Sequence, residues 1–515
     1  MITKKNLAVL FLFFFSLYCS LIAGQSWDES YHTNLGKRNL VYLFSLGRVE
    51  SYLGYSQYYS SLYWSLQYFF SQLFIYKYQT EINHLINLLF SFSAIFAFYK
   101  IGKQLFHKPI AKILFLLLLF YAPFFGNMGI NPKDTILAFC HLWIFSCVLS
   151  YLKSKNKKKK KKYTYYISFL IAAGTGIQLY FPATLLIIII FLIIELFFLE
   201  NFIDKKFNKT EFYLDFIKIF FFSFAIFILF APDTHSNILY KTYLFFLQSF
   251  ETSRGPSHML IDGIIYAVKD NSSKLYFYRF FLYKSPEFII FLYVLFFCLF
   301  FRIKKFYEIK IKYYFYKLTV VFVLILYPAI ISIVSKFRPY DELRLFLWVI
   351  PYFMIIPGIT IYFLFKNLRF YSYKIFATTF LILCVIYLIK FFLHTPYQYT
   401  YYNIFAGKNI NDKFEIDYQG ISLKEIIKKN QNLFQNKDIK ISTCGLNPEI
   451  VIKYIKIYTL QSVKPVEPSQ ADYIIIVNRA LNLEFTCLQL YKGENISEIK
   501  RDNKLLSLIR KIKHE

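Results

Sequence analysis

The sequence predicts an all-α polytopic membrane protein with about eleven transmembrane helices, followed by a small C-terminal extracytoplasmic α/β domain. Hydrophobic residues make up 57% of the 515 residues and charged residues only 18%, whereas soluble proteins carry about 25% charged residues. Apolar runs long enough to cross a bilayer recur along the first 393 residues. Beyond residue 394 these runs shorten and polar residues become frequent. We therefore expect a transmembrane domain over 1–393 and a separate domain over 394–515.

The individual spans follow from hydropathy. The first apolar run, after Lys4 and Lys5, also fits a signal peptide, but it is longer than a typical signal-peptide core, so we expect a retained anchor. The lysine run 157–162 is expected to be a loop, because each lysine at mid-bilayer costs roughly 3 kcal/mol. The predicted spans cover residues 6–24, 81–100, 112–126, 135–152, 163–181, 183–199, 216–232, 286–302, 318–335, 345–365 and 375–393.

Basic residues orient these spans. The formal net charge of +29 would indicate a nucleic-acid partner in a soluble chain. With the N-terminus inside, however, the inside segments hold 27 Lys and Arg residues and the outside loops hold 14, which agrees with the positive-inside rule. We expect membrane lipids as neighbours, no nucleic acid, a cytoplasmic N-terminus and an extracytoplasmic C-terminus. The compact form of the chain favours a bacterial plasma membrane over an endoplasmic reticulum membrane.

The C-terminal domain has its own pattern. Residues 439–444 and 472–477 have the apolar character of buried strands, and residues 448–457 between them favour a helix. Cys444 and Cys487 are the only cysteines outside the predicted spans. Their spacing leaves open whether they form a disulfide.

Polar residues at the outer ends of the spans are the candidate functional residues, because ionisable groups at membrane depth are costly and usually mark a site. The first outer loop, 25–80, begins with Trp27-Asp28-Glu29-Ser30-Tyr31-His32. In a helix Asp28 and His32 would share a face. The rest of the loop is aromatic and predicts interfacial helices. An ordinary solvated loop and an aromatic belt remain alternative interpretations.

Two further polar clusters lie at the same outer face. Lys133 and Asp134 stand between the third and fourth spans, and residues 336–344 stand between the ninth and tenth. Carboxylates could take a proton there, while Lys and Arg side chains hold an anion. This combination suits a reaction on a lipid-linked phosphate.

The order of these motifs resembles the GT-C superfamily of glycosyltransferases over roughly residues 1 to 420. The sequence is most similar to the dolichyl-phosphate-mannose protein mannosyltransferase family, including its bacterial members and the aminoarabinose transferases. The resemblance rests on Asp28-Glu29 after the first span, Asn131-Pro132-Lys133-Asp134 before the fourth, and the basic and acidic cluster before a late span that contains proline. Residues 396–403 and 417–420 resemble a stretch after the last span of bacterial members.

The resemblance implies an enzyme that transfers a hexose or pentose, with inversion, from a polyprenyl-phosphate donor to a hydroxyl of a protein, lipid or glycan acceptor on the extracytoplasmic face. It implies that Asp28 is the general base, that Glu29 orients Asp28 or the sugar, and that Asp134 is the second acid. The candidates for binding the donor phosphate are Lys133, Lys336, Arg338 and Arg344, with Arg338 ranked first because arginine can grip a phosphate through two hydrogen bonds. The candidates for binding substrate are His32, Tyr340, Asp341 and Glu342.

The sequence leaves open whether a metal ion is bound and which of three functions the protein has. No cofactor is required by the pattern, but Asp28, Glu29, His32 and Asp134 could supply ligands to a divalent metal. A transporter or lipid-linked-sugar flippase is the rival function. It predicts charges within spans and an inverted repeat, whereas the spans hold few charges, Glu195 being the clearest, and no repeat is visible. A non-catalytic scaffold with a sensing tail is a third possibility.

Overall fold

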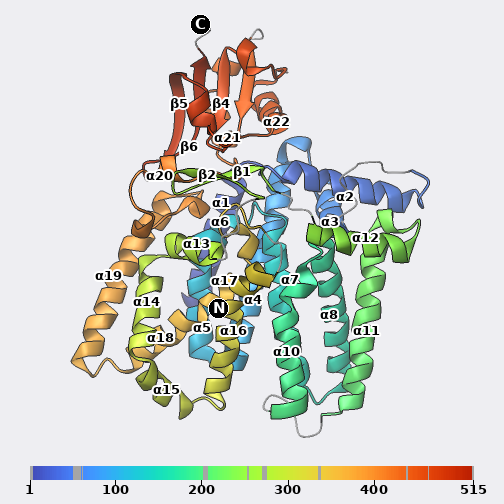
Figure 1. The fold of residues 1–515 in the computed structure, drawn as a ribbon, viewed down its shortest axis with the longest axis vertical. Coiled ribbons are helices and arrows are strands. Elements are labelled where there is room, and N and C mark those ends of the chain that lie inside the picture. The colour runs from blue at the N-terminus through green and yellow to red at the C-terminus, as the bar shows by residue number, and fades with distance from the viewer. Residues whose placement is uncertain are drawn as a thin grey trace.

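The computed structural model describes residues 4–49, 59–60, 62–200, 207–251, 255–269, 275–334, 338–435, 439–461 and 463–512. A bundle of long helices forms the body of the molecule, and a small sheet domain lies at one end of it (Figure 1). This arrangement agrees with the predicted fold class, because helices occupy each predicted span and the sheet comes last in the chain.

The first half of the chain supplies the helices around the two acidic motifs. These helices are α1 (Lys4–Ile22), α2 (Glu29–Phe44), α3 (Leu62–Ser71), α4 (Gln79–Leu105), α5 (Lys108–Leu119), α6 (Ala122–Asn127), α7 (Asp134–Leu152), α8 (Lys157–Ile177), α9 (Phe181–Thr184), α10 (Leu186–Ile194), α11 (Lys209–Leu229) and α12 (Ile238–Glu251). The pair α2 and α3 forms the predicted first outer loop, and α2 lies across the direction of α8 and α11 (Figure 1).

The second half continues the bundle and then connects it to the sheet domain. Its helices are α13 (Tyr276–Lys284), α14 (Glu287–Cys298), α15 (Phe300–Glu308), α16 (Tyr314–Val334), α17 (Ile350–Phe353), α18 (Ile355–Lys366), α19 (Tyr371–Leu393), α20 (Ile410–Lys413), α21 (Leu423–Lys429), α22 (Pro448–Thr459) and α23 (Cys487–Leu490). The hairpin of β1 (His258–Ile261) and β2 (Ile264–Ala267), which the sequence did not predict, lies at the base of the sheet domain (Figure 1).

Within the described residues, five segments are long and apolar enough to cross a membrane by themselves: residues 76–105, which include α4, and helices α7, α11, α16 and α19. Helices α13 and α14 add a sixth if they form one span bent by 114°. Shorter apolar helices occupy further predicted spans. The chain is thus an integral membrane protein by the character of its helices, while the count of eleven crossings stays a prediction.

The lysine run 157–162 was expected to be a loop, and that prediction is wrong, because these residues form the first turns of α8. The side chain of Asn156 caps the helix by accepting from the backbone N–H of Lys159. Lysine is a good helix former. A helix can therefore carry this charge beyond the apolar part of its length.

The sheet domain is a four-stranded sheet in the order β3-β4-β6-β5. The strands are β3 (Ile441–Cys444), β4 (Tyr473–Val477), β5 (Gly493–Arg501) and β6 (Lys504–Ile512). The pair β3 and β4 is parallel and is joined through α22, whereas β6 pairs antiparallel with both β4 and β5. The two predicted strands and the helix between them are confirmed. The β5–β6 hairpin was not predicted, because β5 alternates charged and polar residues with few apolar ones.

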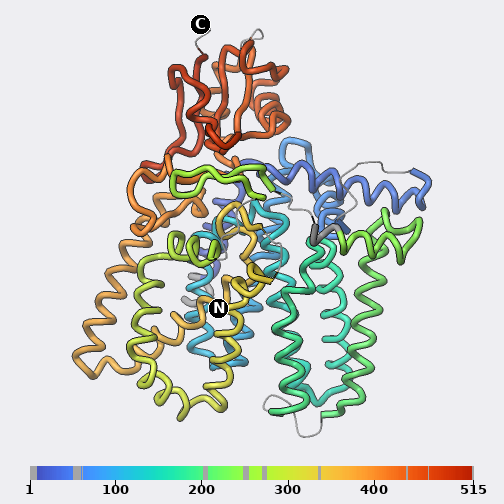
Figure 2. The backbone as a smooth tube through the Cα atoms, in the orientation of Figure 1, coloured from blue at the N-terminus to red at the C-terminus, as the bar shows by residue number. Residues whose placement is uncertain are grey.

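The sheet domain and the bundle share a hydrophobic core. Ala23 at the end of α1, Tyr399 and Ile421 belong to the same buried cluster as Ile475 and Ile509 of the sheet. The chain between α19 and the sheet, orange in Figure 2, lies between the two parts. Because this segment packs on both, the sheet domain is held close to the end of the bundle that carries the candidate site.

Candidate active site

The guanidinium of Arg344 joins three carboxylates that are far apart in the chain. Its Nη2 lies 2.5 Å from Oδ2 of Asp28, its Nε 3.0 Å from Oδ2 of Asp134, and its Nη1 3.1 Å from Oδ2 of Asp341. Asp28 directly precedes α2, Asp134 begins α7, and Arg344 follows the loop after α16. The three predicted polar clusters therefore meet at one point.

Asp134 is held by its own turn. Asn131 Oδ1 accepts hydrogen bonds from the backbone N–H groups of Lys133 and Asp134, and Asn131 Nδ2 donates to Asp134 Oδ2 at 3.0 Å. The other oxygen, Asp134 Oδ1, is buried without a hydrogen-bond partner among the described residues. A buried carboxylate oxygen in this state is available to a ligand.

Asp28 is the most accessible of the three acids, with 35% of its side chain exposed. Burial opposes its ionisation, but attraction to Arg344, His32 and Lys133 outweighs this and lowers the pKa of Asp28 to about 2. Asp28 is therefore ionised at neutral pH. While it is paired with Arg344 it is also a weak base.

His32 lies one helical turn after Asp28, as the predicted shared face requires. Its ring stacks on Trp64 of α3, with 4.2 Å between the ring centroids. Burial, together with Lys133 and Arg344, lowers the pKa of His32 to about 3 despite attraction to Asp28. The imidazole is therefore neutral, and its Nδ1 is buried without a hydrogen-bond partner among the described residues.

Aromatic residues and a lysine complete this side of the site. The ammonium of Lys133, a largely buried residue, lies 5.7 Å from the centroid of the Tyr59 ring. The Arg344 guanidinium carbon lies 5.9 Å from the centroid of the Tyr340 ring. Burial raises the pKa of Tyr340 to about 12, although Lys133 and Arg344 lower it. Two cations thus lie beside the acids, next to aromatic rings.

The loop before Arg344 is held from several directions. Asp341 and Glu342 have φ angles of +51° and +60°, in the left-handed region that non-glycine residues rarely adopt. Glu342 pairs with the fully buried ammonium of Lys284 and accepts a hydrogen bond from the hydroxyl of Tyr402. Burial nevertheless raises the pKa of Glu342 to about 7. These contacts hold the backbone in its unusual conformation.

The structure brings most of the predicted site residues together, but not all of them. Glu29 is held by groups other than Arg344: its carboxylate accepts from the backbone N–H of Ser26 at 2.5 Å and lies 3.0 Å from Nε2 of His84. Arg338, ranked first as the phosphate ligand, donates to the carbonyl of Lys269 at 3.4 Å. Arg344 is the arginine between the acids. Lys336 lies outside the described residues.

The residues that could have supplied metal ligands do not form such a site in the described ranges, where no group of three or more His, Cys, Asp or Glu side chains is arranged to hold a metal ion. The position between Asp28 and Asp134 that a cation would take is held by Arg344.

Sequence reasoning missed several residues that support the site. Arg479 and Glu415 join the network on the side of the sheet domain, and Lys284 and Tyr402 hold Glu342. A signal existed for two of them. Arg479 follows a predicted buried strand, and Tyr402 belongs to the segment 396–403 that carried part of the family resemblance. Lys284 ends an aromatic run and gave no pattern.

Comparisons with known proteins address the fold that carries these residues. The structure is similar to ArnT from Cupriavidus metallidurans bound to undecaprenyl phosphate, with a TM-score of 0.52, 10% identity and coverage of 98% of both chains. The apo state of the same protein gives a TM-score of 0.50 and 10% identity, covering 98% of this chain and 96% of that one. The chain therefore shares the overall fold of this ArnT.

A family profile supports the GT-C resemblance from sequence. The profile of the dolichyl-phosphate-mannose-protein mannosyltransferases matches residues 63–234. This range includes Lys133 and Asp134 and leaves Asp28 and Arg344 outside. No curated protein matches the sequence. The GT-C resemblance predicted from the motifs is confirmed, and these comparisons support a membrane glycosyltransferase.

Proposed function

We propose that this protein transfers a sugar, with inversion, from a polyprenyl-phosphate carrier to a hydroxyl of a protein, lipid or glycan acceptor on the extracytoplasmic face of the membrane. The observation that carries this proposal is the guanidinium of Arg344 between Asp28 and Asp134. One cation that can bind a phosphate thus lies against two carboxylates that can bind a hydroxyl. The undecaprenyl phosphate bound by the ArnT of similar fold supports a donor of this class.

The proposed reaction begins with the donor phosphate. A phosphate that approaches Arg344 and Lys133 competes with Asp28 for the guanidinium, because both are anions that bind arginine through charge-assisted hydrogen bonds. Partial release of Asp28 raises its pKa from about 2 towards the usual carboxylate value. Donor binding therefore turns a weak base into a stronger one.

Transfer then follows by a single displacement. Asp28 accepts the proton of the acceptor hydroxyl while the hydroxyl oxygen bonds to the anomeric carbon of the sugar. The bond from that carbon to the phosphate oxygen breaks, and its electron pair leaves with the polyprenyl phosphate. Arg344 and Lys133 stabilise the negative charge that develops on this leaving group. Attack opposite the leaving group inverts the anomeric centre.

Asp134 and His32 have supporting roles in this proposal. The unpartnered Oδ1 of Asp134 can accept a hydrogen bond from a sugar or acceptor hydroxyl, and the neutral ring of His32 offers a further polar atom. Glu29 has an indirect role, because its carboxylate contacts His84 and the backbone of Ser26. It holds the turn between α1 and α2 that carries Asp28.

The membrane arrangement remains part of the proposal. We infer about eleven crossings, a cytoplasmic N-terminus and an extracytoplasmic sheet domain in a bacterial plasma membrane. The disulfide between Cys444 and Cys487 supports an extracytoplasmic sheet domain, because disulfides persist in oxidising compartments.

A transfer assay tests the proposal. Purified protein is mixed with undecaprenyl-phosphate-linked sugars, mannose first because of the family match, together with membrane acceptors, and released undecaprenyl phosphate is measured. We expect wild-type turnover with at least one donor and a loss of 10²-fold or more in Asp28→Asn, the scale of a general base. The matched control is Asp233→Asn, since Asp233 pairs with Arg38 of α2 outside the cluster.

The same assay separates the rival function. A flippase would move a lipid-linked sugar between the leaflets of a vesicle without releasing undecaprenyl phosphate. Such movement without turnover for every donor tested, or full turnover in Asp28→Asn, would contradict the proposed function.

A further inference from the structure

Arg479 connects the sheet domain to the carboxylates around Arg344. Arg479, in the segment after β4, has its Nη2 3.2 Å from Oδ1 of Asp341 and its Nη1 2.6 Å from the carbonyl oxygen of Tyr418. Its Nε lies 3.6 Å from Oε2 of Glu415. Only 14% of the Arg479 side chain is exposed. Its guanidinium is thus fixed by three groups and is part of the buried network.

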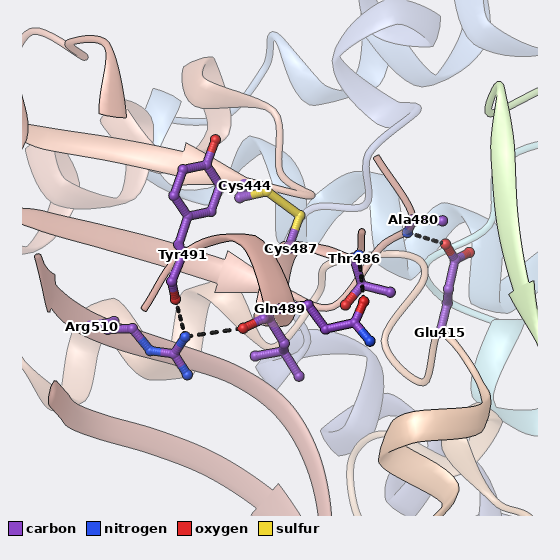
Figure 3. Close-up of a disulfide and its surroundings, with 9 residues drawn as sticks. Glu415, Cys444, Ala480, Thr486, Cys487, Gln489, Tyr491 and Arg510 are labelled. Atoms are coloured by element: carbon purple, nitrogen blue, oxygen red, sulfur yellow. Dashed lines mark hydrogen bonds between the residues drawn. A yellow bond between two sulfur atoms is a disulfide. The ribbon is translucent and has the colours of Figure 1, made fainter. Parts of the chain in front are cut away.

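The segment that carries Arg479 is itself anchored. The carbonyl of Arg479 accepts a hydrogen bond of 2.9 Å from the backbone N–H of Cys487, and Cys487 is joined to Cys444 at the end of β3 by a disulfide. The next residue, Ala480, donates its N–H to Glu415 Oε1 at 2.7 Å. Figure 3 shows the disulfide and the Glu415–Ala480 contact on opposite sides of Thr486.

The close packing beneath Arg479 depends on a glycine. Gly445 has a φ of +69°, and a Cβ at this position would lie 2.2 Å from the carbonyl oxygen of Val477 and 2.9 Å from Cγ of Arg479. A side chain here would push the segment away from β3. The sheet, the disulfide and this glycine together fix the base of the Arg479 side chain.

Asp341 is divided between two arginines. Its Oδ2 lies against Arg344 and its Oδ1 against Arg479. If Arg479 were removed, Asp341 could offer both oxygens to Arg344, because a carboxylate and a guanidinium favour a two-point contact. That contact would compete with the hydrogen bonds from Arg344 to Asp28 and Asp134.

We propose that Arg479 is a positioning residue by which the C-terminal sheet domain sets the geometry of the transfer site: it holds Asp341 so that Arg344 stays between Asp28 and Asp134. The inference rests on the proposed function, since it assigns a role in that reaction. Arg479 touches neither Asp28 nor Asp134 through its hydrogen bonds. The sheet domain thus contributes a positioning residue to the active site.

The expected effect is kinetic. A displacement of about 1 Å at a reacting group can cost roughly 10²-fold in rate, so we expect Arg479→Met to lower kcat by about 10- to 100-fold. The KM for the acceptor should change little, because no acceptor contact is assigned to Arg479. Arg479→Lys keeps the charge but cannot make all three contacts, so its kcat should lie between those of wild type and Arg479→Met.

A second arginine of the sheet domain provides the matched control. Arg501 on β5 donates to the carbonyl of Thr395 at 2.9 Å and lies 2.7 Å from Glu425. It therefore also connects the sheet domain to the preceding segment, but away from Asp341. If the arginines only hold the domain in place, Arg501→Met should lower kcat as much as Arg479→Met does.

The experiment compares wild type, Arg479→Met, Arg479→Lys, Arg479→Ala and Arg501→Met in the transfer assay, with thermal unfolding measured for each. We expect kcat to decrease from wild type through Arg479→Lys to Arg479→Met, and to stay near the wild-type value in Arg501→Met. Added guanidinium should restore part of the kcat of Arg479→Ala. Equal losses in Arg479→Met and Arg501→Met, no recovery by guanidinium, or failure of every Arg479 variant to fold would overturn the inference. Absence of turnover in the wild type would instead count against the proposed function.

Discussion

The Nε of Arg344 lies 3.0 Å from Oδ2 of Asp134, although 210 residues separate them in the chain. The same guanidinium contacts Asp28 at the beginning of α2 and Asp341 in its own loop. Such a buried cation is tolerated because three carboxylates surround it. The contact joins the first outer loop, the start of α7 and the loop after α16 into one chemical unit.

The turn of Asn131 is expected to set the position of Asp134. Asn131→Ala removes the acceptor for the N–H groups of Lys133 and Asp134 and the donor to the Asp134 carboxylate. A hydrogen bond of this kind contributes about 0.5–1.5 kcal/mol. Thermal unfolding should show the corresponding decrease in stability, together with a lower kcat. A variant with wild-type stability and activity would show that Asp134 is held by other contacts.

Glu415 is expected to make stability depend on pH. Burial raises the pKa of Glu415 to about 7 despite Arg479, from a usual value of 4.5. A carboxyl whose pKa is raised by folding stabilises the folded state below its unfolded pKa, and this contribution is lost as pH rises through the folded pKa. The stabilisation due to Glu415 should therefore be lost between pH 4.5 and 7, in the opposite direction to His32, whose lowered pKa makes the folded state more stable as pH rises.

The matched variant is Glu415→Gln, which keeps an acceptor for the N–H of Ala480 and does not titrate. The melting temperature of the variant minus that of the wild type should increase as pH rises from 4.5 to 7. An identical pH dependence in the two proteins would remove Glu415 as the cause. Glu342, whose pKa is also raised to about 7, should leave part of the dependence in the variant.

The disulfide is expected to matter for activity as well as for stability. Replacing Cys444 and Cys487 by serine opens a link across a sequence separation of 43 residues, and loss of such a bridge typically costs about 2–4 kcal/mol. Because Cys487 donates to the carbonyl of Arg479, kcat should fall too. Reductant should lower wild-type activity and leave the serine variant unchanged. Equal sensitivity of both proteins would exclude the disulfide as the target.

Much of the fold was predictable because the bilayer imposes it. A run of apolar residues such as that of α16 or α19 has few alternatives to a helix in lipid, and a buried strand such as β4 is continuously apolar. The helical start of α8 was missed because a hydropathy scan treats lysines only as a cost in the membrane and not as helix formers. The β5–β6 hairpin was missed because its outer strand is largely polar.

The acids of the candidate site stood out in the sequence, and Arg344 was among the four candidate cations, but Arg338 was ranked above it. Asp28 and Asp134 stand out because they follow or precede an apolar span directly, and Asp341 and Arg344 belong to a dense charged cluster. Sequence does not show which arginine of that cluster turns inward, because this depends on the left-handed backbone at Asp341 and Glu342. The role of Arg479 could not be predicted either, because it depends on the packing of the sheet domain on the bundle.

The central claim is that Arg344 binds the donor phosphate between Asp28 and Asp134. Undecaprenyl phosphate binding is measured in detergent for wild type, Arg344→Lys, Arg344→Met and Arg338→Met. Hydrogen bonds to charged groups contribute about 1.5–3 kcal/mol, so we predict that Arg344→Met weakens binding by at least about 10-fold, that Arg344→Lys weakens it less, and that Arg338→Met stays close to wild type. Strong loss in Arg338→Met with intact binding in a folded Arg344→Met would contradict the account.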